Sequence, residues 1–104
     1  MISLPEPWHL PEGEEFETLL HEFQLELPPV HLLAGVSVEL AGHDGNDDIL
    51  LRHVQHKDLF TVVHLSWLGK EELPNHPWVE FTGTLMEFRN WYSALLGSAC
   101  VSRL

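Results

Sequence analysis

Cysteine and long apolar runs are both scarce in this chain of 104 residues. Cys100 is the single cysteine, which excludes an intramolecular disulfide and favours a reducing compartment. No apolar run approaches the ~18 residues of a membrane span. The first residues also lack the basic and apolar segments of a secretory signal. We therefore expect a cytoplasmic protein with no membrane-embedded part.

Basic residues are scarce as well, and this leaves a strong negative charge. Only 5 Lys and Arg oppose 16 Asp and Glu, giving a formal net charge of −11. Such a surface repels nucleic acid and anionic lipid, and it attracts basic proteins. Solubility alone is the plainer explanation of the charge. We expect no binding to nucleic acid or to a membrane, and we expect a basic protein as the partner.

Motifs for nucleophilic catalysis, phosphate binding and dinucleotide binding are absent from the sequence. The eight histidines include no pair with the four-residue spacing of a helical zinc site. His53 and His56 stand at a predicted strand end without a second ligand pair. Histidines on neighbouring strands could still converge, for example His53 with His64. Scattered, hydrogen-bonded histidines explain the pattern better. We predict no catalytic residue, no metal and no cofactor.

Hydrophobic periodicity predicts the fold class. Apolar residues recur at helical spacing over 12–26, and a second helical pattern begins at a capping box, Thr84 to Glu87, and ends near Gly97. Between the two, period-two runs predict strands over 32–40, 49–54 and 60–67, with a short edge strand at 78–81. We predict one α+β domain over 1–104. Its sheet is an antiparallel three- to four-stranded meander, with an N-terminal and a C-terminal helix packed on one face.

The remaining segments are predicted as connections. Residues 1–11, which contain three prolines, form an extended arm that lies over the domain through Trp8. Residues 69–77 form a polar surface loop, and 98–104 form a loose tail. Asp44, Asn46 and Asp48 copy the first half of a calcium loop, but the glycine and glutamate of the second half are missing. A hairpin turn explains them better.

The strand predicted over 60–67 is the segment around which the chain is organised, and its last residue, Trp67, is expected in the core. Its Val-Val-His-Leu-Ser-Trp string resembles a family of small uncharacterised bacterial proteins that share a Val-Val-His-Leu-(Ser/Thr)-Trp strand. The Asn-Asp-Asp-Ile-Leu run at 46–50 and the Pro-Trp-Val-Glu-Phe segment at 77–81 are part of the resemblance, which covers residues 32 to 92. It implies a bacterial, cytoplasmic setting, and it supplies no activity and no catalytic residues.

Two kinds of side chain are predicted to bind a partner. Glu15, Glu22 and Glu26 fall together on one flank of the first helix at ~100° per residue. Trp8 and Trp78 lie in proline-flanked segments, where an exposed indole can anchor an interface. We therefore predict a non-catalytic, acidic protein-binding domain. An immunity- or antitoxin-type inhibitor of a basic partner, such as a nuclease, is the concrete form of this prediction.

Two alternatives stay open at this point. A polar row of Glu39, Arg52, His64 and Ser66 on one sheet face would suit a small enzyme or a metal- or ligand-binding protein, with Glu39 opposite Arg52 if the register allows it. Apolar residues could instead make that face a homodimer interface of unknown role. Those residues are Leu33, Leu50, Val54 and Val62.

Overall fold

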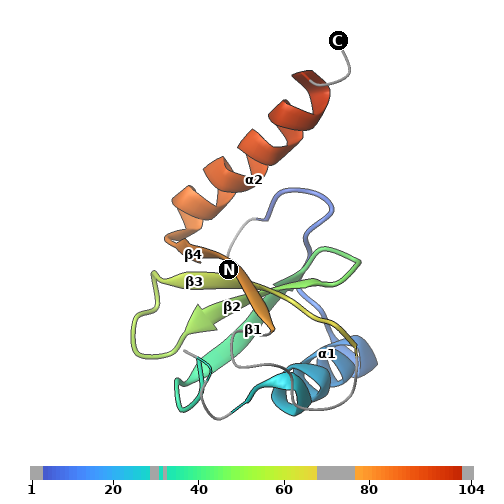
Figure 1. Cartoon of the computed structure of the whole chain (residues 1–104), viewed down its shortest axis with the longest axis vertical. Helices are drawn as coiled ribbons and strands as arrows, with labels where there is room; N and C mark the ends of the chain where they lie inside the picture. The colour runs from blue at the N-terminus through green and yellow to red at the C-terminus, as the bar shows by residue number, and fades with distance from the viewer. Residues whose placement is uncertain (1–3, 29–30, 32, 68–76, 102–104) are drawn as a thin grey trace.

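The chain forms one four-stranded sheet between two helices, and the computed structural model describes residues 4–28, 31, 33–67 and 77–101, with the backbone alone at 97–101. The elements are α1 (Gly13–Glu26), β1 (Val38–His43), β2 (Asp48–His53), β3 (Phe60–His64), β4 (Trp78–Gly83) and α2 (Leu85–Val101). The strands pair antiparallel in the order β1-β2-β3-β4 (Figure 1). The predicted α+β class and the meander are confirmed.

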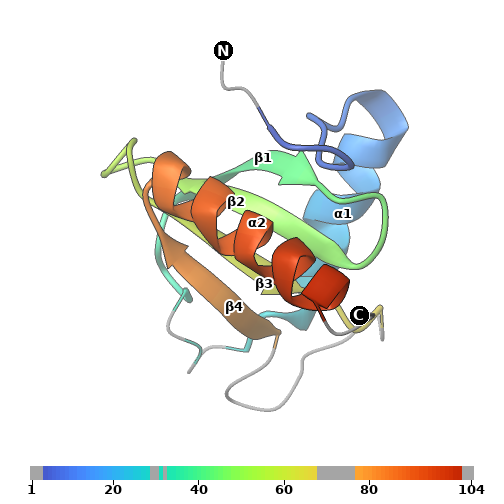
Figure 2. The ribbon, with the colours of Figure 1, turned by 90° about the horizontal axis from the view of Figure 1, so that it is seen from above.

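The two helices cover opposite faces of the sheet, so the prediction that both pack on one face is wrong (Figures 1 and 2). Leu19 of α1 packs with Ile49 and Leu51 in one core, whereas Phe88 of α2 packs with Leu50 in the other. Successive side chains of a strand point to opposite faces. Because β2 is apolar on both faces, each face needs a covering element.

Three strands differ in length from the prediction, and one of them, β4, extends to Gly83, two residues beyond its predicted end. β1 begins at Val38 instead of residue 32, because backbone hydrogen bonds close turns over 31–36; residue 32 itself lies outside the described residues. β3 ends at His64, three residues early. The chain leaves the sheet there because Trp67 adopts a left-handed backbone with φ of 63°. The Glu26 carboxylate stabilises this bend by accepting the N–H groups of Ser66 and Trp67.

The capping box before α2 is confirmed. Thr84 N donates to Glu87 Oε1 at 2.8 Å, and Glu87 N donates to Thr84 Oγ1 at 3.2 Å. The helix continues past Gly97 to Val101, so its predicted end is wrong and residues 98–101 are helical. The rest of the predicted tail, 102–104, lies outside the described residues. The predicted loop over 69–77 also lies outside them, apart from Pro77.

The turn between β1 and β2 has the predicted hairpin chemistry. Asp44 Oδ1 accepts the backbone N–H of Asn46 at 2.8 Å and that of Asp48 at 3.2 Å. Gly45 takes the left-handed backbone, with φ of 85°. This carboxylate oxygen is therefore used in holding the turn, whose ends are His43 and Asp48.

The N-terminal arm lies against β1. His9 and His43 exchange two backbone hydrogen bonds of 2.9 Å, and Trp8 is buried in the core on the α2 side. The arm is thus part of the packed structure, as predicted for Trp8. Across the described residues, neither helix has the length and apolar character needed to cross a membrane.

Candidate functional site

The predicted acidic flank of α1 is not an exposed surface. Glu26 is fully buried and Glu22 is nearly so. Burial, followed by a hydrogen bond with Glu22, raises the pKa of Glu26. This flank packs against the segment that follows β3, a contact that helical spacing cannot reveal. Of the three glutamates only Glu15 reaches solvent, so the flank is wrong as a partner-binding surface.

The tryptophans divide differently from the prediction. Trp8 is only 4% exposed and lies edge-on to Phe88, with ring centroids 5.1 Å apart, so it cannot anchor an interface. Trp78 is 53% exposed, as predicted. Trp67, which we expected in the core, is 41% exposed and donates its Nε1–H to Asp47 Oδ1 at 2.8 Å. The left-handed turn at this residue carries its side chain out of the β3 pleat.

The predicted polar row on the sheet is split between the two ends of β2. Glu39 lies opposite Arg52 in the register, as expected. His64 lies opposite Asp48, four residues from Arg52 along β2, or roughly 13 Å. Ser66 lies beyond the end of β3, with its N–H bound to Glu26. These residues do not converge on one ligand.

The face proposed for homodimerisation is also not open. Leu50 and Val62 lie under α2, and Leu33 belongs to the core on the α1 side. Only Val54 is exposed. Glu39 and Arg52 instead line a cavity of about 400 Å³ beside the arm. Its other lining residues are Leu4, Trp8, His9, Leu10, Leu40 and Ala41.

A group that we name the carboxylate edge is formed by Asp48, His64, Trp78 and Glu80, from three neighbouring strands. The Nδ1 atom of His64 lies 2.8 Å from Asp48 Oδ1. Trp78 is the register partner of His64. One polar atom each from Asp48, His64 and Glu80 lie within 4.8 Å of one another. Two acids and one imidazole thus meet beside an exposed indole.

The carboxylate edge has an excess of negative charge. Burial, followed by the hydrogen bond with Asp48 and the repulsion from its charge, raises the pKa of Glu80 to about 7. The hydrogen bond with Asp48 also raises the pKa of His64. Glu80 therefore retains a proton through part of the neutral range, because burial, followed by the nearby Asp48, disfavours its charged form.

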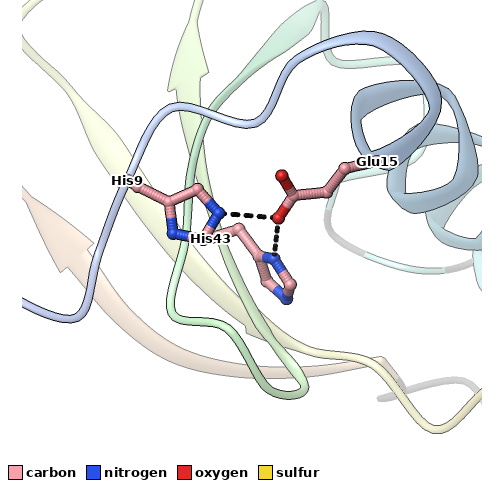
Figure 3. A group of neighbouring side chains, drawn as sticks. All are labelled: His9, Glu15 and His43. Carbon is pink, nitrogen blue, oxygen red and sulfur yellow. Dashed lines mark hydrogen bonds and ion pairs between the residues drawn. The ribbon is translucent and has the colours of Figure 1, made fainter.

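A second group, which we name the histidine clamp, consists of His9, Glu15 and His43. The three come from the arm, the first turn of α1 and the end of β1 (Figure 3). Glu15 Oε2 lies 2.7 Å from His9 Nε2 and 2.6 Å from His43 Nδ1. The backbone pairing of His9 with His43 positions both rings, whose centroids are 5.5 Å apart. One carboxylate oxygen thus lies between two imidazoles.

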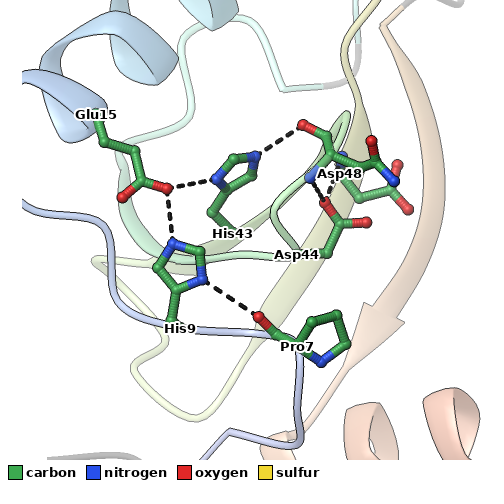
Figure 4. A network of polar contacts seen from close by, with 7 residues as sticks. Pro7, His9, Glu15, His43, Asp44 and Asp48 are labelled. Carbon is green, nitrogen blue, oxygen red and sulfur yellow. Dashed lines mark hydrogen bonds and ion pairs between the residues drawn. The ribbon is translucent and has the colours of Figure 1, made fainter.

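The outer nitrogen of each ring faces a backbone carbonyl (Figure 4). His9 Nδ1 lies 3.2 Å from Pro7 O, and His43 Nε2 lies 2.8 Å from Asn46 O. His43 is buried, whereas His9 is half-exposed. The hydrogen bonds with His43 and then His9 lower the pKa of Glu15, and the bond with Glu15 raises the pKa of His9.

Sequence reasoning missed the histidine clamp and identified different histidines. The convergence considered for His53 with His64 does not occur, because the two lie at opposite ends of the sheet. His53 instead bonds Thr61 Oγ1, and the ring of His31 bonds Pro77 O. The only local signal for the clamp was Glu15 in the first turn of a helix preceded by a histidine-containing arm.

We compared the chain with protein-family models, curated proteins and solved structures, and none of the three comparisons yields a match. The functional argument therefore depends on the geometry of the histidine clamp and the carboxylate edge.

Proposed function

We propose that this is a non-catalytic, cytoplasmic protein that binds a basic partner protein through the carboxylate edge. The single observation that carries the proposal is a pair of neighbouring carboxyl groups, Asp48 and Glu80, beside one imidazole, where burial and then Asp48 raise the pKa of Glu80 to about 7. A lysine or arginine side chain of a partner can replace the proton that Glu80 retains and form charge-assisted hydrogen bonds. The role predicted from the sequence, binding of a basic partner protein, is kept. The binding surface that we propose lies on the sheet instead of on α1.

Trp78 supports this location. Its indole is 53% exposed and lies opposite His64, at the same sheet end as the carboxylates. An exposed indole can contact a cation through its ring face, and tryptophan is enriched among residues that dominate binding energy. An aromatic ring beside paired carboxylates suits an arginine or lysine side chain with its aliphatic stem.

The distribution of charge along the sheet also supports a basic partner. Asp44 and Asp47 add negative potential at the end that holds the carboxylate edge. Arg52 and Lys57 lie at the other end of β2, where Arg52 Nε donates to Lys57 O. With a net charge of −11, the whole chain would attract a basic protein, and the edge would orient it. An immunity- or antitoxin-type inhibitor of a basic partner is the specific form of this proposal.

Titration of the isotope-labelled protein with an octa-arginine peptide tests the proposal by NMR. We expect the largest shift changes at His64, Trp78 and Glu80. Glu80→Gln should weaken binding about threefold to tenfold, or roughly 1 kcal/mol. Affinity should rise from pH 6 to pH 8, because Glu80 loses its proton and His64 loses its charge.

The matched control is Glu17→Gln, which removes the same charge from an exposed site on α1. If this variant and Glu80→Gln lose affinity equally, or if the shift changes spread over the whole surface, the binding is unspecific charge attraction and the proposed site is wrong. Raising the salt concentration should weaken binding in all variants.

A further inference from the structure

We propose that the histidine clamp is a binding site for a divalent transition metal, with Zn²⁺ the best match, and that His9 Nε2, Glu15 Oε2 and His43 Nδ1 are its ligands. This site is separate from the carboxylate edge and does not depend on the proposed function. It also departs from the sequence-based expectation of no metal.

The hydrogen-bond donors of the two rings give the first argument. A backbone carbonyl only accepts, so the nitrogens that face Pro7 O and Asn46 O must carry hydrogen. In a neutral imidazole the other nitrogen then has a lone pair. In both rings that lone pair points at the same carboxylate oxygen, which also has only lone pairs to offer. In this tautomer three electron-pair donors lie within 4.8 Å of one another, an arrangement that a cation can bridge.

Glu15 Oε2 lies within 2.7 Å of both ring nitrogens, and the buried position of His43 fixes one of the two rings. A single divalent ion satisfies all three donors and leaves both rings neutral. Two imidazoles and one carboxylate form a ligand set found in zinc sites that keep an open position.

The surroundings of the ligands match a metal site as well. Histidines that bind metal usually donate their second ring N–H to a carbonyl or carboxylate, which fixes the tautomer and the ring orientation. Both rings of the clamp have this arrangement (Figure 4). The backbone pairing of His9 with His43 holds the two nitrogens in place without the ion.

The geometry requires only a small adjustment. Ligand atoms of a tetrahedral zinc ion with bonds of about 2.0–2.1 Å lie about 3.3 Å apart. The nitrogen–oxygen distances here are 2.7 and 2.6 Å, so the carboxylate must withdraw by less than about 1 Å. The Glu15 side chain is 38% exposed and can move. Glu15 and His43 also line a cavity of about 340 Å³, which gives an ion a route in and leaves room for a water ligand.

Calorimetric titration of the full chain with ZnCl₂ tests the site. We expect one ion per chain, with His9→Gln, Glu15→Gln and His43→Gln each weakening binding at least about tenfold, the effect known for disturbed zinc sites. His21→Gln and His56→Gln, which change exposed histidines outside the clamp, are matched controls and should bind like wild type. Circular dichroism verifies that each variant folds. His9→Gln keeps the test decisive if the buried His43→Gln does not fold, because His9 lies on the surface.

The ring nitrogens provide a second readout, by NMR of labelled histidines. Zinc should shift the resonances of His9 Nε2 and His43 Nδ1 and leave the outer nitrogens protonated. Wild-type zinc affinity retained in both His9→Gln and Glu15→Gln would overturn the proposal. If His64→Gln abolished zinc binding and His9→Gln did not, the ion would bind at the carboxylate edge. That result would also overturn the proposal. Absence of any saturable binding to wild type would do so as well.

Discussion

The histidine clamp and the carboxylate edge use the same residue types in opposite proportions. In the clamp one carboxylate lies between two imidazoles, and the pKa of Glu15 is lowered. At the edge one imidazole lies beside two carboxylates, and the pKa of Glu80 is raised to about 7. We propose the clamp, with its two imidazoles, as the metal site. The edge presents uncompensated negative charge that suits a cationic side chain.

The two clusters are also close neighbours on opposite sides of the sheet. His43 ends β1 and Asp48 begins β2, so one hairpin turn separates them. His43 contacts Glu15 of α1, whereas Asp48 shares its face with Leu50, which packs under α2. Because the alternation of a strand sends adjacent side chains to opposite faces, one turn supplies residues to both clusters.

The largest expected difference in stability between the two clusters is between the loss of Trp8, beside the clamp, and the loss of Trp78, at the carboxylate edge. Trp8→Ala should cost about 3–5 kcal/mol of unfolding free energy, because it removes a buried indole next to His9. Trp78→Ala should change stability by no more than about 0.5 kcal/mol, since its side chain is largely exposed. Urea unfolding followed by circular dichroism measures both. Similar losses in the two variants would contradict the division into a packed arm and an open edge.

The loss of His43 from the clamp should also reduce the unfolding free energy more than the loss of His64 from the edge. The difference should be smaller than that between the tryptophans. His43→Ala should cost about 1–3 kcal/mol, because a buried side chain loses two hydrogen bonds and leaves Asn46 O unpaired. His64→Ala should cost less than about 0.5 kcal/mol, because its ion pair with Asp48 is exposed. His21→Ala, at an exposed position of α1, gives the baseline for urea unfolding. An equal cost for His43 and His64 would mean that the clamp is no better buried than the edge.

The pH dependence of stability should separate Glu80 from other glutamates. Its folded pKa, about 7, lies above the ordinary value of 4.5, so wild type has this contribution to stability below pH 4.5 and loses it as the pH rises through about 7. Glu80→Gln should remove that loss, a relative gain of about 1 kcal/mol at pH 8 after allowance for solvent screening of an exposed group. Urea unfolding at pH 5 and pH 8 measures it. Glu17→Gln should keep the wild-type difference between the two pH values, and a flat profile in that control would remove Glu80 as the cause.

The smallest expected effect on stability is that of Glu15, and its dependence on pH should be opposite to that of Glu80. The pKa of Glu15 is lowered, so its contribution is present above pH 4.5 and is lost as the pH falls through its folded value. With EDTA present, Glu15→Gln should cost about 0.5 kcal/mol near pH 6, because the side chain is 38% exposed and solvent screens its charge. The cost should shrink in acid. It should also shrink above the raised pKa of His9, where that ring loses its charge. A cost that stays constant from pH 3 to pH 8 would argue against the ion pairs of the clamp.

Local chemistry made several features predictable. The capping box at Thr84 and the turn at Asp44 depend on contacts between residues no more than four positions apart, so their residue types are sufficient to predict them. The opposition of Glu39 and Arg52 followed from the lengths of two strands and one turn. Trp78 was correctly placed at the surface, whereas the same proline-flanked context did not predict the burial of Trp8.

The failures share one physical cause. Helical spacing put Glu26 on a polar flank, but the bend after β3 donates two backbone N–H groups to it and buries it. Trp8 was predicted both to hold the arm on the domain and to anchor an interface, and the second role is lost because Phe88, 80 residues away in sequence, provides an apolar surface that buries the indole. In each case the partner is distant along the chain, and no local pattern encodes which distant groups meet.

The sequence by itself determined the periodicity of the helices and strands, the meander and the negative charge, because each follows from composition or from neighbouring residues. Only the tertiary structure decided that the helices take opposite faces, since β2 is apolar on both sides and either face could receive either helix. It also decided that His9, Glu15 and His43 meet, although 6 and 28 residues separate them. That contact required the arm, α1 and β1 to pack together, and packing is set by burial over the whole chain.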